Sequence, residues 1–163
     1  MKRNIRILSL VPTSRGTGYI IAETPPLFVL QRSVLSREYG QDQHIKELAR
    51  LIAWNRPEVL LLEDLNSTYY RREKTRTTIE AVIGLASGYG IAVRAIAKED
   101  VYAQFNVSET ATKAVIARLA AELLQDPSIT KLVPGDRRLW EAEPYWMPMF
   151  EALALLLTAL KAD

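Results

Sequence analysis

The carboxylates that stand out in this sequence lie beside apolar runs. Glu63 and Asp64 end one such run, and Glu151 is the only charged residue in the last apolar segment, residues 144–160. Because an unpaired buried carboxylate is costly, Glu151 indicates a polar cleft in an apolar region. The chain has no cysteine and a single histidine, His44. Any metal ion would therefore be held by oxygen ligands such as these carboxylates.

Each of these acids also has a purely structural interpretation. Glu63 would then end a strand, facing solvent or capping Thr68. Glu151 would lie in the opening turn of a helix that begins at Pro148, where exposed backbone amides and the helix dipole stabilise a negative charge. The sequence leaves both interpretations open.

Basic residues gather in two stretches that suit a phosphate backbone. The first stretch contains one acid, Glu73, and has two tyrosines before it; the second lies beside Trp140. Stacking tyrosines and cations are typical of nucleic-acid contacts, although a solvated helix face has the same composition. The candidate contact residues are Tyr69, Tyr70, Arg71, Arg72, Lys74, Arg76, Arg137 and Arg138. The net charge of +2 adds little to either interpretation.

The turn near the N-terminus is a further candidate contact. Its small residues Thr13, Ser14, Gly16 and Gly18 would let backbone amides approach a phosphate, with Arg15 pairing to it. A tight hairpin requires small residues in any case.

The apolar patterns predict the elements that must position these residues. Strands are expected over residues 5–11, 18–23, 27–31, 59–62 and 91–96. Helices are expected over residues 42–54, 68–87 and 99–105, from a cap at Ser108 or Thr110 to about Gln125, and over residues 148–161. Residues 126–140 are expected to form a loop.

This order of elements predicts an α/β fold with a mixed five-stranded sheet. An antiparallel meander of three strands is followed by parallel strands, with helices on both faces. The 163 residues suit a single domain, 1–163. The few apolar residues before Pro12 are too short for a signal peptide or membrane span, which favours a cytoplasmic protein.

The stretch Leu10-Val11-Pro12-Thr13-Ser14-Arg15-Gly16-Thr17-Gly18-Tyr19 resembles the opening of RuvC-type Holliday junction resolvases and their YqgF-like relatives. In that family it reads Asp-Pro-Gly-Ser/Thr-Arg, two further residues, then Gly. The resemblance continues at Leu61-Leu62-Glu63 and over residues 149–155, and it spans almost the whole chain. It implies the ribonuclease H-like fold.

The resemblance also implies hydrolysis of a phosphodiester assisted by Mg or Mn ions. The family's metal-binding acids fall on Val11 at the end of the first strand, on Glu63, and on Glu151 and Pro148 in the last helix. Glu63 and Glu151 are thus the remaining candidate catalytic and metal-binding residues. Since Val11 cannot bind a cation, the resemblance implies a nucleic-acid-binding protein that is inactive or impaired as a nuclease.

A rearranged metal site is an alternative. Asp64 does not simply replace the missing acid, because neighbouring strand residues point to opposite faces. Glu141 and Glu143 precede the last helix closely enough to reach the site, and Ser9 shares the strand face of Val11.

Two further functions remain open alongside binding to branched DNA or structured RNA. In the first, the chain would be a structural protein that uses the fold to form a homodimer. The apolar second half of the 68–87 helix, together with Tyr145 and Trp146, would then form the interface. In the second, the chain would be an actin-like or sugar-kinase ATPase, which the single domain without a second phosphate loop disfavours.

Overall fold

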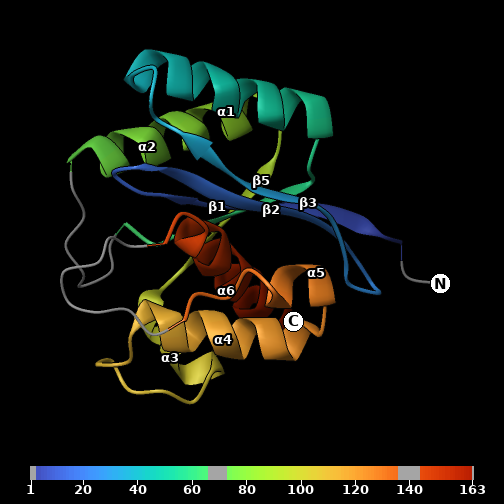
Figure 1. The fold of residues 1–163 in the computed structure, drawn as a ribbon. Coiled ribbons are helices and arrows are strands. Elements are labelled where there is room, and N and C mark those ends of the chain that lie inside the picture. The colour runs from blue at the N-terminus through green and yellow to red at the C-terminus, as the bar shows by residue number, and fades with distance from the viewer. Residues whose placement is uncertain (1–2, 66–72, 136–143, 163) are drawn as a thin grey trace.

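A five-stranded mixed sheet forms the centre of the molecule (Figure 1). The computed structural model describes residues 3–65, 73–135 and 144–162. Strands β1 (Ile5–Pro12), β2 (Gly16–Thr24) and β3 (Phe28–Ser36) are antiparallel neighbours. Strands β4 (Val59–Glu63) and β5 (Ala92–Ile96) continue from β1 in parallel, giving the order β3-β2-β1-β4-β5. The predicted meander and parallel strands are confirmed.

Helices cover both faces of this sheet. Helices α1 (Gln41–Asn55) and α2 (Glu73–Gly88) lie on one face, and α6 (Met147–Ala162) lies directly on the other (Figure 1). Helices α3 (Lys98–Gln104), α4 (Lys113–Leu124) and α5 (Pro127–Thr130) form an outer layer beyond α6. Because α6 is enclosed between the sheet and this outer layer, it is apolar on nearly every side.

The alternation of side chains along the strands divides the interior into two cores. In β1, Leu8 and Leu10 pack beneath α1 and α2, whereas Ile7 and Val11 pack against α6. The first group, called here the α1/α2 core, also contains Leu48, Ile52, Ile79 and Val82. The second, the α6 core, also contains Ile20, Leu61, Phe150 and Leu153.

Four predicted details are wrong. Helix α4 is capped by Thr112, whose Oγ1 accepts a hydrogen bond from the Val115 amide at 3.3 Å, and not by Ser108 or Thr110. The expected loop after residue 125 contains the short helix α5, which Asp126 caps through the Ser128 amide.

Strand β3 runs on to Ser36, because its pairing with β2 continues through a polar stretch. Helix α6 begins at Met147, so Glu151 lies beyond the opening turn.

A buried histidine joins the sheet to α1. His44 is 1% exposed, its Nδ1 lies 3.2 Å from the carbonyl of Ser36, and its Nε2 lies 2.7 Å from Oγ1 of Thr17. Since the carbonyl can only accept, Nδ1 carries the proton and Nε2 accepts the hydroxyl hydrogen of Thr17. Burial, followed by the charge of Arg37, lowers the pKa of His44 below its ordinary value.

This lowered pKa makes the stability of the protein sensitive to mild acid. The unfolded chain binds a proton at His44 near pH 6.5, whereas the folded chain resists it, so the free energy of unfolding should fall as the pH drops below about 6.5. Urea unfolding between pH 8 and pH 5 measures this loss. In the variant His44→Asn the dependence on pH over this window should be weaker, and an unchanged dependence would contradict the assignment.

Candidate active-site pocket

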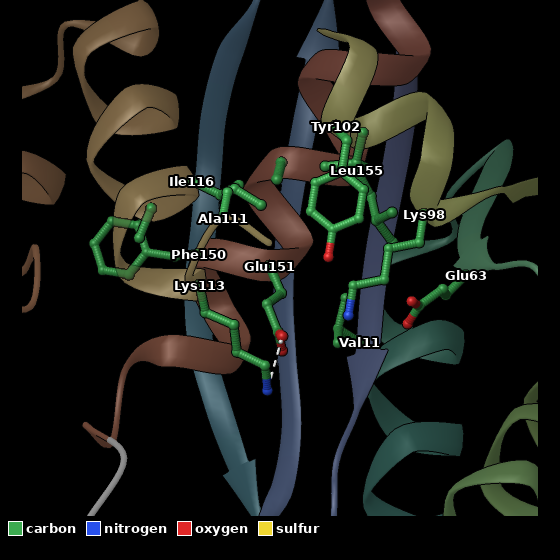
Figure 2. A pocket seen from close by; sticks show the side chains of 13 residues that line it. Val11, Glu63, Lys98, Tyr102, Ala111, Lys113, Ile116, Phe150, Glu151 and Leu155 are labelled. Carbon is green, nitrogen blue, oxygen red and sulfur yellow. Dashed lines mark ion pairs between the residues drawn. The ribbon is translucent and has the colours of Figure 1, made fainter. Parts of the chain in front are cut away.

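One pocket brings together the two acids and the valine that the sequence singles out. Val11 from the end of β1, Glu63 from the end of β4 and Glu151 from α6 all line it (Figure 2). The other described residues of its wall come from α3, α4, α6 and the segment before α4: Lys98, Val101, Tyr102, Ala111, Lys113, Ile116, Ala117, Phe150, Ala154 and Leu155. The cavity of about 50 Å³ has room for a few water molecules or an ion.

The sheet register places Val11 beside Glu63. Ser9 of β1 pairs with Leu61 of β4 in parallel, so continuing both strands by two residues brings Val11 and Glu63 level. Leu61 and Val11 both belong to the α6 core, and Glu63 shares that face because strand side chains alternate. Asp64 follows the end of β4 and does not line the pocket.

Two close contacts fix the start of α6, and therefore Glu151, over the sheet. The hydroxyl of Ser9 donates a hydrogen bond of 2.7 Å to the carbonyl of Ala152, in a fully buried position. At Gly18 of β2, a Cβ atom would overlap the backbone of Pro148 and Met149. Gly18 thus lets the helix approach the sheet closely, and a Cβ at Gly16 would likewise meet the carbonyl of Leu35 in β3. Both glycines therefore have structural reasons within the fold.

Two lysines accompany the two acids. The ammonium of Lys113, the first residue of α4, lies 3.1 Å from Oε1 of Glu151. Lys98, the first residue of α3, extends its ammonium toward the space between the two carboxylates, in front of Val11 (Figure 2). The second oxygen of Glu151, Oε2, is buried and accepts no hydrogen bond within the described residues.

Neither lysine is predicted from the sequence as part of the site, although the position of each carries a signal. A cation at the start of a helix faces the positive end of the helix dipole, which costs a few tenths of a kcal/mol. Lys98 and Lys113 each take this unfavourable position. A compensating acid is therefore expected nearby, and for Lys113 it is Glu151.

The pocket does not fit the two-cation centre that the resemblance implies. Val11, 4% exposed, and Pro148, also buried, have no oxygen ligand in their side chains. One of the remaining acids, Glu151, already pairs with an ammonium group. No cluster of three or more histidine, aspartate or glutamate side chains suited to a metal occurs among the described residues. Glu141 and Glu143 lie outside these residues.

The candidate contact residues that the structure describes lie on elements that meet at the pocket end of the sheet (Figure 1). Arg15, Lys74 and Arg76 are all exposed. Arg37 connects the β1–β2 turn to α2 through two hydrogen bonds. Its backbone amide donates to the carbonyl of Arg15, and its own guanidinium donates to the hydroxyl of Thr78. The other candidate contact residues, Tyr69, Tyr70, Arg71, Arg72, Arg137 and Arg138, lie outside the described residues.

The surfaces expected to form a dimer are partly used inside the protein. In the second half of α2, Val82 and Ala86 belong to the α1/α2 core, and Ile83 is exposed. Trp146 packs against the α6 core, whereas Tyr145 is exposed and donates a hydrogen bond to the carbonyl of Val34. A homodimer stays a prediction.

None of the helices within the described residues is long and apolar enough to cross a membrane.

Comparison with known proteins gives a likeness in structure alone. No model of a protein family matches the sequence, and no curated protein does. Among solved structures, Thermus thermophilus RuvC in complex with a Holliday junction substrate has a TM-score of 0.64 and 17% identity, over 97% of this chain and 94% of that one. A second structure of Thermus thermophilus RuvC has a TM-score of 0.63 and 18% identity, over 96% and 95%. The chain therefore has the ribonuclease H-like fold of RuvC.

Proposed function

We propose that the chain binds branched or folded nucleic acid and has lost most or all metal-dependent hydrolysis. One observation carries the proposal: Val11 lines the pocket between Glu63 and Glu151, where the resemblance calls for a carboxylate. The likeness to RuvC over nearly the whole chain supports the nucleic-acid part, because that protein is bound to a Holliday junction substrate.

Exposed cations near the pocket end of the sheet support a contact with a phosphate backbone. Arg15 projects from the β1–β2 turn, and Lys74 and Arg76 lie in the first turn of α2. Cations on adjoining elements attract a polyanion without reading its bases, so the affinity should depend strongly on salt. Binding by shape agrees with a preference for branched or folded substrates over one defined sequence.

The pocket chemistry supports the loss of hydrolysis. Metal-assisted cleavage requires several carboxylates to hold two cations around the reacting phosphate. Val11 offers no oxygen ligand at the position where the resemblance calls for a carboxylate. Lys113 competes with any metal ion for Glu151, because the two side chains form an ion pair. Glu63 and Glu151 are therefore the part of the expected two-cation centre that remains, and their catalytic role stays a prediction.

Salt-dependent binding tests the nucleic-acid part. The protein should bind a four-way DNA junction or a folded RNA, and its affinity should fall by about 10- to 100-fold between 50 and 200 mM salt if about three phosphates are contacted. In the double variant Lys74→Ala with Arg76→Ala, the slope of log affinity against log salt should become shallower by about two. Fluorescence anisotropy titrations measure both quantities.

A matched double variant controls for net charge. Arg3→Ala with Arg50→Ala removes the same charge from exposed positions near the other end of the sheet, and binding should change little. Equal losses in both double variants, or binding that salt does not affect, would refute a specific interface. Incubation of the same junction with Mg or Mn should produce no cleavage, whereas cutting that Glu63→Gln abolishes would disprove the loss of hydrolysis.

A further inference from the structure

We propose that Lys113, assisted by Lys98, supplies the positive charge that balances Glu63 and Glu151, so that an internal ammonium takes the place of a divalent cation. The inference concerns the metal dependence of the pocket and stands whether or not the chain binds nucleic acid.

The contact between Lys113 and Glu151 carries the proposal. Their charged atoms lie 3.1 Å apart, and the side chains are 43% and 20% exposed. An ammonium at this distance satisfies one carboxylate oxygen, as a metal ion would. Unlike a divalent metal ion, it has a single charge and no directed coordination sites. Oε2 of the same carboxylate stays buried without a hydrogen bond from the described residues, so Lys113 satisfies only one of the two oxygens.

The balance of charge in the pocket supports the same conclusion. Among the described residues that line it, two carboxylates and two ammonium groups carry formal charges that cancel. A divalent cation entering this neutral cluster would meet two positive side chains, one of them directed at the space in front of Val11 (Figure 2). Removing an ammonium leaves an uncompensated acid, which favours either a proton or a metal ion.

Thermal unfolding with and without Mn²⁺ tests the proposal. The wild-type protein should unfold at the same temperature, within about 1 °C, in EDTA and in 10 mM MnCl₂. The variant Lys113→Met should unfold at a lower temperature in EDTA and recover by about 3 to 5 °C in MnCl₂, if the ion binds with a dissociation constant near 1 mM. Adding Glu151→Gln to this variant should abolish the recovery.

A lysine elsewhere provides the control. Lys131 is exposed, and Lys131→Met removes the same charge without altering the pocket. It should therefore respond to MnCl₂ as the wild type does. A Lys113→Met variant that unfolds at the wild-type temperature in EDTA and does not respond to Mn²⁺ would overturn the proposal.

If Lys113→Met fails to fold, the binding of Mn²⁺ to the wild-type protein still tests the proposal. The electron paramagnetic resonance signal of free Mn²⁺ should be as strong with the wild-type protein as with the variant Glu151→Gln. A loss of free Mn²⁺ that requires Glu151 would show that the pocket binds a divalent cation despite its lysines. That result would leave the nucleic-acid proposal intact, because salt-dependent binding is measured separately.

Discussion

The substitution Gly18→Ala should lower the free energy of unfolding by at least about 3 kcal/mol, or prevent folding altogether. The added Cβ would overlap the backbone of Pro148 and Met149 at the start of α6. Backbone atoms in a packed helix have no alternative rotamer, so either α6 or β2 must shift. The start of α6 is held to the sheet by the hydrogen bond from Ser9 to Ala152, and a shift would strain this contact too. Urea unfolding measures the loss.

Gly84→Ala is the matched control for this substitution. Gly84 lies within α2, and a Cβ built there meets nothing within 4 Å. Because alanine favours a helix over glycine, this variant should be more stable by up to about 1 kcal/mol. If the two variants have similar stability, the close approach of α6 to β2 at Gly18 is wrong.

The substitution Phe150→Ala should cost about 3 to 5 kcal/mol of stability. Phe150 is 1% exposed in the α6 core and is among the largest fully buried side chains within the described residues. Its loss leaves a cavity between α6 and its neighbours, and it also removes part of the pocket wall next to Glu151. Thermal unfolding should show a midpoint lower by about 10 °C.

Phe28 offers a control of the same residue type. It lies at the start of β3 and is 65% exposed, so Phe28→Ala should change stability by less than about 0.5 kcal/mol. Comparable losses at the two positions would contradict the central position of α6 in the core.

The order of strands and helices could be predicted because the apolar patterns are strong. The continuous apolar run before Glu63 indicated a strand covered on both faces, and its neighbour β1 is buried in the same way. The apolar last helix with one acid indicated a buried helix beside a polar pocket, and α6 has this position. These features depend on burial along a single segment, which a sequence records directly.

Details that depend on contacts between segments could not be predicted. Strand β3 extends to Ser36 because backbone hydrogen bonds to β2 continue where the side chains give no pattern. The choice of Thr112 over Ser108 or Thr110 as helix cap depends on where the preceding loop ends. The sequence connects Gly18 only with the nearby turn, because Pro148, whose backbone it meets, is distant in sequence.

The pocket lysines show the same limit most clearly. Lys98 and Lys113 lie on separate helices, and neither belongs to the basic stretches that composition singled out. Only the packing of α3 and α4 beside α6 brings them to the two acids. The pair formed by Lys113 and Glu151 therefore emerges from tertiary structure.

The position of α6 beneath the sheet has a consequence for how the chain folds during synthesis. The strands and the helices α1 and α2 precede α6, so they leave the ribosome before it. Until α6 is synthesised, the sheet face that carries Ile7, Ile20 and Leu61 lacks the helix that packs on it. Nascent chains that expose such a face are prone to aggregate. We therefore expect the incomplete chain to depend on chaperones until its last helix docks.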